Sequence, residues 1–274
     1  MPARNREMVE ALPIVNEPRE PRILLWDIET APLKVYTWGV WEQNAIWVAE
    51  QWHLLTIAWK FLGDKKVQVL GLDDFDGYEK DPSNDFSLVE KAWELFNEAD
   101  IVVAHNGIAF DTKKIKARMI IHGMQPPSNI HEVDTLKLAR KHFAFTSNKL
   151  NDVCEVLGIG VKVSTGGYGL WRDIIEKQDP KAWSKMKVYN KHDVELLEQL
   201  YLKLRPWSTN HPNLATISDR PDACPKCGDT TKGLVVRGYK YTAVSARVSY
   251  RCNACGGYSS GRKIAKPTQT KYVS

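Results

Sequence analysis

Two acidic residues, Asp27 and Glu29, end an apolar run that begins at Ile23. Side chains two positions apart in a β-strand lie on the same face, so both carboxylates would leave a strand here beside Leu25. Two like charges in such a site are costly unless a cation neutralises them, because buried carboxylates without a partner take up protons. The pair therefore indicates a cation site, with an exposed strand end as the alternative.

A third carboxylate, Asp193, interrupts the apolar stripe of a predicted helix over 181–204. The stripe consists of residues spaced by three or four positions: Met186, Tyr189, Asp193, Leu196, Leu197, Leu200 and Leu204. A carboxylate on the inward face of a helix needs a partner, and Tyr189 lies one turn earlier on that face. We therefore expect Asp193 to face a site; a buried aspartate bonded to a backbone group is the alternative.

A fourth candidate, Asp111, follows a predicted strand over 101–104 and a turn at 105–107, where a predicted helix over 110–122 begins. A helix cap is its alternative role. The four carboxylates come from three segments and could converge at the C-terminal edge of a sheet, where Mg²⁺ would find the oxygen ligands that it prefers. Asp134 could be an acid beside this site, with a surface or capping position as the alternative.

Three segments resemble the exonuclease motifs of the DEDD superfamily. They are Asp27-Ile28-Glu29-Thr30, Asn106-Gly107-Ile108-Ala109-Phe110-Asp111 and Tyr189-Asn190-Lys191-His192-Asp193. A tyrosine four residues before the last aspartate is typical of the tyrosine subgroup; the histidine subgroup has a histidine five residues before it, where this chain has Val188. The resemblance covers about 22–207, and it is to the proofreading domain of family-B DNA polymerases and to related stand-alone phage and bacterial exonucleases.

This resemblance implies a ribonuclease H-like fold and removal of nucleotides from the 3′ end of a nucleic acid. Two Mg²⁺ or Mn²⁺ ions would be held by Asp27, Glu29, Asp111 and Asp193. One ion would activate water and the other would stabilise the leaving 3′ oxygen. Tyr189 would position the attacking water, because a tyrosine with an ordinary pKa near about 10 is a poor base at pH 7.

Substrate contacts are expected from residues around the carboxylates. We assign them to Thr30, Trp38, Asn106, Phe110 and Lys149. Trp38 lies in a turn-like stretch where its ring could stack on the terminal base, and Lys149 could contact the phosphate chain. Asn106 could brace the site instead, and a core position is the alternative for Phe110. Five tryptophans lie close together in this segment, at positions 38, 41, 47, 52 and 59. Most of them are expected in the core.

Two Cys-x-x-Cys pairs, separated by 24 residues, lie near the C-terminus. They are Cys224/Cys227 and Cys252/Cys255. Each pair is followed by glycine, which allows the tight turns by which backbone wraps a tetrahedral metal–thiolate centre. The spacing resembles a zinc ribbon with strands over 233–241 and 244–251. Because all four positions are cysteine, one zinc ion would be structural; two disulfides are the alternative.

Charge is divided unevenly along the chain. Residues 1–200 hold 25 Lys+Arg against 30 Asp+Glu, a net −5, whereas residues 201–274 hold 13 against 3, a net +10. The basic residues near the cysteines are Arg237, Lys240, Arg247, Arg251, Arg262, Lys263, Lys266 and Lys271, beside Tyr239, Tyr241 and Tyr250. An acidic body with a basic end indicates chemistry on an anionic polymer. We expect the basic end to bind nucleic acid; a solvated face or a protein-docking module is the alternative.

The elements that would position these residues indicate an α/β domain of about 200 residues with a mixed sheet. Strands are predicted from Ile23 and over 54–61, 66–72 and 101–104, and helices over 86–98, 110–122, 150–157 and 181–204. We expect four parts: a flexible leader over 1–21, a ribonuclease H-like exonuclease domain with flanking helices over 22–207, a zinc ribbon over 208–261 and a basic tail over 262–274.

Composition excludes several classes of protein. With 43% apolar and 26% charged residues, the 274-residue chain has material for a core and is not disordered throughout. No apolar run approaches the roughly 18–20 residues of a membrane span, and the first 22 residues lack a secretory signal. We expect a monomer in the cytosol of a bacterium or a phage-infected cell, with no membrane partner.

The expected substrate is single-stranded DNA or a DNA 3′ end, and a replicative polymerase is an expected partner. Two alternatives stay open. One is an exoribonuclease that trims RNA 3′ ends, and the other is a nucleic-acid- or polymerase-binding protein with a vestigial nuclease site. The sequence does not separate them, because recognition of a 2′-hydroxyl depends on local geometry.

Overall fold

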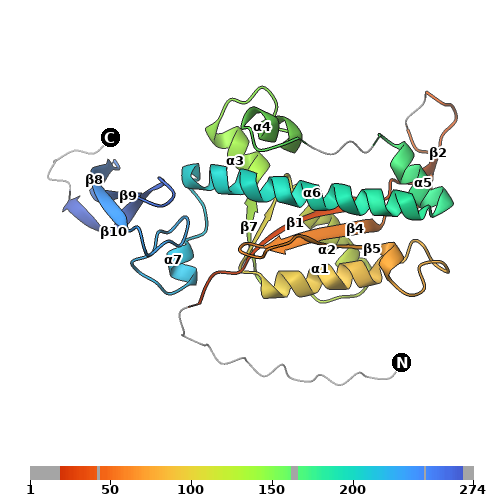
Figure 1. Ribbon diagram of the computed structural model, residues 1–274, viewed down its shortest axis with the longest axis horizontal. Coiled ribbons are helices and arrows are strands. Elements are labelled where there is room, and N and C mark those ends of the chain that lie inside the picture. Colours follow the sequence, from red (N-terminus) through yellow and green to blue (C-terminus); the bar gives the residue numbers. More distant parts are fainter. Residues whose placement is uncertain (1–18, 42–43, 162–165, 244, 268–274) are drawn as a thin grey trace, which may run out of the picture.

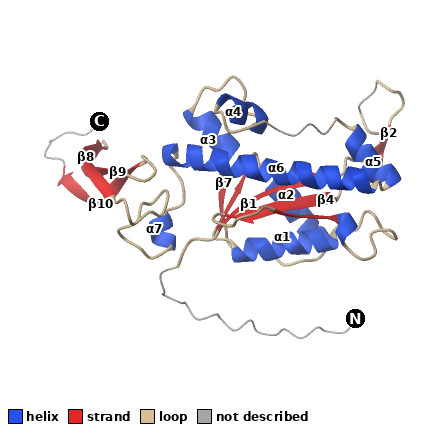
Figure 2. Ribbon diagram, viewed as in Figure 1, coloured by secondary structure: helices blue, strands red, loops and turns tan. Residues whose placement is uncertain are grey.

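A five-stranded mixed sheet forms the centre of the larger part of the molecule (Figures 1 and 2). The computed structural model describes residues 19–41, 44–161, 166–243 and 245–267. The strands are β1 (Ile23–Thr30), β4 (Leu54–Phe61), β5 (Gln68–Gly71), β6 (Ile101–Ala104) and β7 (His131–Asp134). Their order is β5-β4-β1-β6-β7, with β4 antiparallel to β1 and β5, and β6 parallel to β1 and β7. The central strand is therefore β1, which ends at the predicted acidic pair.

Helices cover both faces of this sheet. They are α1 (Phe86–Glu98), α2 (Asp111–Ile121), α3 (Thr135–His142), α4 (Leu150–Val156), α5 (Gly169–Lys177) and α6 (Pro180–Leu204), with short 3₁₀ turns η1 (Leu72–Asp74) and η2 (Arg205–Trp207). On one face α1 and α2 pack against the sheet, and on the other lie α3, α4 and the C-terminal half of α6. The result is a layer of strands between two layers of helices.

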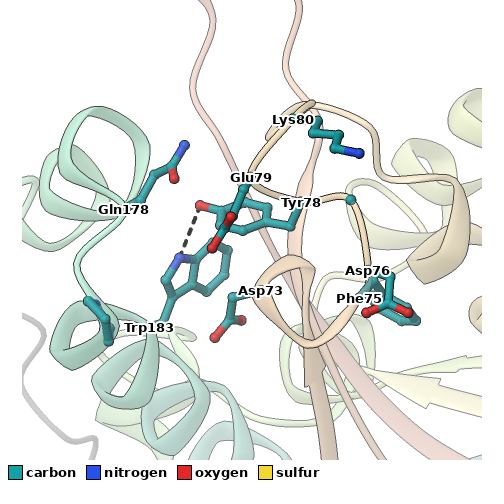
Figure 3. Close-up of a pocket in the computed structure, with 10 residues that line it drawn as sticks. Asp73, Phe75, Asp76, Tyr78, Glu79, Lys80, Gln178 and Trp183 are labelled. Atoms are coloured by element: carbon teal, nitrogen blue, oxygen red, sulfur yellow. Dashed lines mark hydrogen bonds between the residues drawn. The ribbon is translucent and has the colours of Figure 1, made fainter.

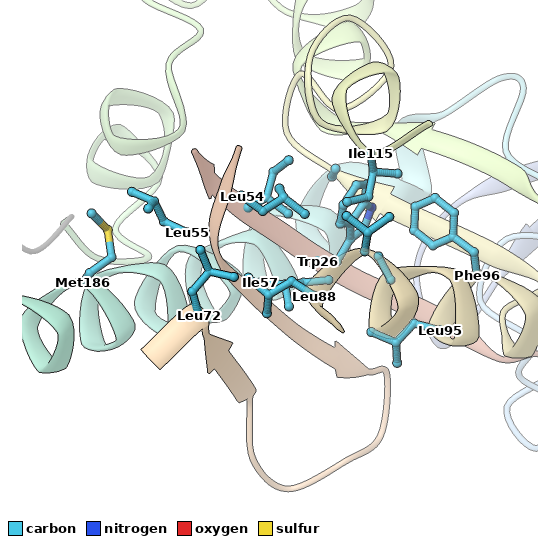
Figure 4. Packing of buried hydrophobic residues seen from close by; sticks show 14 of the residues in the cluster. Trp26, Leu54, Leu55, Ile57, Leu72, Leu88, Leu95, Phe96, Ile115 and Met186 are labelled. Carbon is cyan, nitrogen blue, oxygen red and sulfur yellow. The ribbon is translucent and has the colours of Figure 1, made fainter. Parts of the chain in front are cut away.

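Alternation along β1 divides the interior into two cores. Trp26 points toward α1, where its ring meets that of Phe96 edge-on with the centroids 4.9 Å apart (Figure 4). Leu25 points toward α6 and belongs to the second core. Because alternate residues face opposite sides, Asp27 and Glu29 lie on the α6 side as well. The burial of these large side chains, each worth roughly 1.5–3 kcal/mol, holds β1 in place.

The longest helix, α6, carries the third predicted carboxylate. It begins at Pro180, whose fixed φ suits the first helical position, and the Asp179 carboxylate accepts a hydrogen bond of 2.9 Å from the backbone N–H of Lys181. Its 25 residues span roughly 37 Å. Pro206 follows its last turn. The helix therefore reaches from the sheet to the C-terminal part of the chain (Figure 1).

A separate antiparallel sheet forms the cysteine module, our name for residues 208–267. After α7 (Leu214–Ile217) come β8 (Leu234–Tyr241), β9 (Ser245–Cys252) and β10 (Tyr258–Pro267), in the order β10-β9-β8. Among its described residues the buried side chains are Ser208, Leu214, Ser218, Ala223, Cys224, Ala246 and Cys252, and Leu214 belongs to the second core of the larger part. So small a core cannot stabilise a domain without a further link between its parts.

A two-stranded ribbon interrupts the chain between β1 and β4. It consists of β2 (Lys34–Tyr36) and β3 (Trp47–Glu50), paired antiparallel to each other and to no strand of the main sheet. We call its described residues, 33–41 and 44–50, the aromatic hairpin. Both of its strands lie at the surface.

Most of the predicted architecture is confirmed. The antiparallel meander of β1, β4 and β5, the parallel strand β6 and the long helix α6 lie close to their predicted positions. The aromatic hairpin, β7 with α3, and α5 were not predicted. The strand β10 continues to Pro267 and so includes residues assigned to the basic tail. Most of the predicted leader, residues 1–18, and the tail beyond 267 lie outside the described residues.

No helix among the described residues is both long and apolar enough to cross a bilayer.

Candidate functional site

Three of the predicted carboxylates meet where β1 ends against α6. One oxygen from each of Asp27, Glu29 and Asp193 lies within 4.8 Å of the other two. Asp193 is buried and the other two are half-buried. Three negative charges so close together repel one another unless a cation or a proton joins them. We call these three residues the acidic cluster.

Regular backbone geometry brings the acidic cluster together. Asp27 and Glu29 flank Ile28, which is buried in the core on the α1 side, so the two carboxylates emerge on the α6 side. Asp193 lies on the buried stripe of α6, and the half-buried Tyr189 lies one turn before it. The cluster is thus held by two elements that the hydrophobic cores fix in position.

A buried asparagine, Asn190, orients one of these carboxylates and was not predicted. Its Nδ2 donates a hydrogen bond of 2.7 Å to Asp27 Oδ2, and its Oδ1 accepts one of 2.9 Å from Thr56 Oγ1 on β4. Both Asn190 and Thr56 are fully buried. Donation to the carboxylate favours its charged form and fixes its rotamer. The sequence does contain a signal for this role, because Asn190 precedes Asp193 by three residues and so lies on the same face of the helix.

The fourth predicted ligand, Asp111, lies beside the acidic cluster. It is the first residue of α2, and its carboxylate accepts a hydrogen bond from the backbone N–H of Ile28, between the two acids of β1. Burial, together with the negative charge of Asp134, raises the pKa of Asp111 to about 7, whereas Lys114 lowers it. A cation bound at the cluster would oppose this increase in the pKa.

Asp134 has the capping role that was its alternative. Its Oδ1 accepts hydrogen bonds from the backbone N–H groups of Leu136 and Lys137 at the start of α3, at 3.0 and 3.3 Å. The same oxygen accepts one of 3.0 Å from the backbone N–H of Asn106. Asn106 has a φ of 69°, which few residues other than glycine adopt. Asp134 therefore fixes the turn that leads to Asp111.

A lysine that sequence reasoning missed, Lys114, borders the acids. Its Nζ donates a hydrogen bond of 2.7 Å to Thr30 Oγ1 and lies 4.4 Å from the centre of the Phe110 ring. Burial lowers the pKa of Lys114, while the charges of Asp111 and Glu29 raise it. The sequence contains a signal for this position, because Lys114 follows Asp111 by three residues and residues so spaced share a helix face.

The predicted substrate contacts lie on several different elements. Thr30 ends β1, and Lys114 joins it to Phe110. Phe110 is 44% exposed, so its alternative placement in the core is wrong. Lys149 is exposed just before α4, and Trp38 lies on the aromatic hairpin.

His105 has a structural role. One ring nitrogen lies 2.9 Å from Thr135 Oγ1 and the other 2.9 Å from the backbone oxygen of Asn148. The ring thereby connects the turn before Asp111 to the segment that carries Lys149. Both nitrogens are engaged, so His105 is not available as a ligand.

The acidic cluster fits a hard divalent cation. Its donor atoms are carboxylate oxygens, the ligands that Mg²⁺ and Mn²⁺ take in proteins. A fourth carboxylate, Asp111, lies beside this group of three, and burial is the main cause of its raised pKa, which the nearby Lys114 only partly offsets. The side chains of the acidic cluster therefore fit such an ion.

The four cysteines form a second cluster, with sulfur donors. Their ligand atoms all lie within 4.8 Å of one another, and none of the four forms a disulfide. Cys224 Sγ lies 3.9 Å from Cys255 Sγ, and Cys227 Sγ lies 3.7 Å from Cys252 Sγ. Sulfurs about 2.3 Å from a central zinc would be about 3.8 Å apart in a tetrahedron. The cluster therefore fits Zn²⁺ and leaves no open coordination position.

A pocket of about 510 Å³ lies apart from both clusters, between the loop after η1 and the start of α6 (Figure 3). Trp183 Nε1 donates a hydrogen bond of 3.1 Å to the Tyr78 hydroxyl at its wall. Trp183 precedes Asp193 by ten residues, roughly 15 Å along the helix. The described residues that line it include none of the predicted site residues.

Comparisons with known proteins agree with the fold. A family model described as RNase H superfamily matches residues 25–205. A DNA polymerase III PolC-type of Ureaplasma parvum serovar 3 is 38% identical over 115 residues, which are 42% of this chain and 8% of that protein. The family B DNA polymerase structure from the archaeon Pyrobaculum calidifontis matches with a TM-score of 0.50 and 16% identity, over 73% of this chain and 27% of the other. The chain thus spans only a small part of each polymerase's length.

Proposed function

This chain belongs to the RNase H superfamily, and from that premise we propose that it is a metal-dependent 3′–5′ exonuclease of the DEDD type acting on DNA. The observation that carries the proposal is the acidic cluster, in which β1 and α6 bring three carboxylates within 4.8 Å. The partial match to a DNA polymerase III PolC-type supports a role on DNA.

In this proposal the chain's own residues hold and orient the reacting groups. Asp27, Glu29, Asp193 and the adjoining Asp111 would hold two Mg²⁺ or Mn²⁺ ions. When bound, such ions lower the pKa of a water molecule and stabilise the leaving 3′ oxygen. Asn190 keeps Asp27 in one orientation through a hydrogen bond of 2.7 Å.

In this proposal we assign the chain to the tyrosine subgroup of the DEDD superfamily because Tyr189 precedes Asp193 by four residues. The Tyr189 hydroxyl would orient the attacking water, and the bound ions would supply the acidity of that water. The side chain is half-buried on α6, one turn before Asp193. Lys114 would offset part of the negative charge that an incoming phosphate meets, since it lies against Thr30.

The cysteine module would hold one structural Zn²⁺ and grip the nucleic acid. Its four sulfurs leave no coordination position for substrate. Exposed basic residues of its described strands include Arg237, Lys240 and Arg251, with Tyr241 exposed nearby. Phosphate contacts of this kind weaken steeply as salt rises.

Digestion of end-labelled oligonucleotides tests the proposal. We expect the wild-type protein with Mg²⁺ to release single nucleotides from the 3′ end of single-stranded DNA, so that a 5′ label yields a ladder and a 3′ label yields mononucleotide at once. The double variant Asp27→Ala/Glu29→Ala should be inactive. Digestion by that variant at the wild-type rate would refute the proposal. If the wild type digested RNA faster than DNA, the substrate would be RNA.

A further inference from the structure

The aromatic hairpin stands next to the acidic cluster. It is inserted between β1 and β4, the strands that carry Glu29 and Thr56, and only three residues separate the end of β1 at Thr30 from the start of β2 at Lys34. In Figure 1 the hairpin projects from the molecule at the end where α5 lies. The root of the hairpin therefore lies within a few residues of Glu29.

The hairpin exposes large aromatic rings to water. Trp38 is 83% exposed and Trp41 is 94% exposed, contrary to the expectation that most of these tryptophans lie in the core. Tyr36 and Trp47 are also exposed, and their ring centroids lie 5.7 Å apart across the two strands. Monomeric proteins rarely keep so much apolar surface together in water, so the hairpin is expected to have a binding partner.

A pocket at the root of the hairpin joins it to the candidate site. The pocket has a volume of about 480 Å³ and is lined by Thr30, Pro32, Leu33, Trp52, Lys114 and Trp171, among others. Lys114 Nζ lies 4.5 Å from the centre of the Trp52 ring while it donates to Thr30. The aromatic surface therefore continues from the hairpin to the residue that follows Glu29.

Charge does not explain what the hairpin binds. Its charged residues, among those that the structure describes, are Lys34 and Glu50, which pair with each other at 2.8 Å. The hairpin thus offers phosphates no net attraction, and flat rings are its means of contact. Bases of a single strand present such faces in succession, and stacking on them is tolerant of sequence.

We infer that the aromatic hairpin is a stacking platform that binds unpaired bases of single-stranded nucleic acid beside the acidic cluster. This inference rests on the proposed function, which places the 3′ end of the nucleic acid strand at the acidic cluster. Binding of the strand to the hairpin itself requires no hydrolysis. A base pair hides both faces of its bases within the duplex stack, so the platform favours single strands over duplexes.

Fluorescence anisotropy with a 5′-labelled oligothymidylate tests this inference. The full-length Asp193→Asn protein is used, so that binding is measured without digestion. Adding Trp38→Ala and Trp41→Ala should weaken binding at least about tenfold, because each stacked base contributes roughly 1–3 kcal/mol. The loss should be the same at every salt concentration, since stacking releases no counterions and leaves the salt slope unchanged.

Two matched variants separate stacking from general apolar contact. Val156 is 73% exposed on α4, outside the hairpin, so Val156→Ala should leave affinity unchanged, whereas Trp38→Phe/Trp41→Phe should retain most of it because phenyl rings also stack. Unchanged affinity in the double alanine variant would overturn the inference. Equal losses in the alanine and phenylalanine variants would overturn it too.

Failure of this inference and failure of the proposed function are distinguishable. Binding is measured in a protein that lacks Asp193, and digestion is measured in the wild type. A wild type that digests DNA while the hairpin variants bind normally refutes the platform alone. A wild type that digests nothing while the tryptophan variants lose affinity refutes the nuclease alone.

Discussion

The acidic cluster and the cysteine cluster both gather groups that repel when ionised, yet they depend differently on the rest of the chain. The carboxylates project from β1 and α6, which two hydrophobic cores fix in position. The cysteines lie in a module whose buried side chains beyond residue 222 are two alanines and two of the cysteines themselves. In the first region the fold places the ligands, and in the second the metal must hold the fold together.

Removing zinc should have the largest effect, and it should be confined to the cysteine module. Structural zinc sites contribute on the order of 10 kcal/mol or more to folding, far more than the small core here can replace. We expect chelation or Cys224→Ser to abolish amide-exchange protection of β8, β9 and β10 while α1 and β1 stay protected.

Cys154 provides the control for that experiment. It is buried in the core beside α6, away from the cysteine cluster. The variant Cys154→Ala should still bind one zinc and keep the module protected. Protection of the module in zinc-free protein would contradict the contrast between the two regions.

Removing one carboxylate should affect activity and leave the fold intact. We expect Asp193→Asn to lower kcat by at least about 10³-fold, as when a residue of a catalytic unit is lost. Its free energy of unfolding without divalent ions should equal or exceed that of the wild type, because one of three crowded negative charges is gone. Single-turnover digestion and urea unfolding measure the two quantities.

Glu195 offers a matched control on the same helix. It is exposed and pairs with His192 at 3.2 Å. Glu195→Gln should change neither activity nor stability appreciably, because exposed pairs contribute little. A large loss of stability in Asp193→Asn would show that the fold needs this charge, and it would contradict the claim that the fold places the carboxylates independently of their charge.

The joint between the two regions should weaken in acid. His211 Nδ1 donates to the Pro212 carbonyl at 2.7 Å, and Nε2 accepts from the Tyr201 hydroxyl at 2.7 Å. Burial lowers the pKa of His211 to about 4, and the charges of Arg205 and Lys226 lower it as well. The folded protein therefore favours neutral His211.

The direction of the pH effect follows from this pKa. In the unfolded chain His211 has an ordinary histidine pKa of about 6.5. Between pH 6.5 and pH 4 the unfolded chain therefore binds a proton at His211 that the folded chain does not bind. The stabilisation is complete above pH 6.5 and is lost as the pH falls toward 4, by up to about 3 kcal/mol. Urea unfolding of zinc-loaded wild type and His211→Gln at pH 7 and pH 5 measures it; a difference between the two proteins that does not change with pH would exclude His211 as the cause.

The smallest effect is expected from the support of Asp27. Asn190→Ala removes its hydrogen-bond donor and leaves the buried Thr56 hydroxyl without its acceptor, so metal affinity or activity should fall about 10- to 100-fold. Thr56→Val keeps the bond to Asp27 and should cost less. If Thr56→Val lowered activity as much as Asn190→Ala, packing and not orientation of the carboxylate would be the reason.

Local periodicity predicted the parts of the site that lie on regular elements. The alternation of β1 placed Asp27 and Glu29 on one face, and the helical period of α6 placed Asp193 on the buried stripe. The structure brings these three together, while their role as metal ligands stays a prediction. The cysteine spacing likewise predicted a cluster that the structure contains.

Contacts between distant segments could not be predicted in this way. Asn190 reaches Thr56 across 134 positions, and Lys114 reaches Thr30 across 84. The exposure of Trp38 and Trp41 was missed because burial of a tryptophan depends on whether another element covers it. Strand β7 and helix α3 were too short for their periodicity to be recognised.

Counting bound metal in the two regions tests the central claim most directly. Electron paramagnetic resonance titration with Mn²⁺, combined with zinc analysis, is done on the wild type and on Asp27→Asn/Asp193→Asn. We predict that the wild type binds two Mn²⁺ beside one retained zinc, and that the double variant keeps its zinc and loses the Mn²⁺. Unchanged Mn²⁺ binding by the double variant would contradict the assignment of the acidic cluster as the metal site.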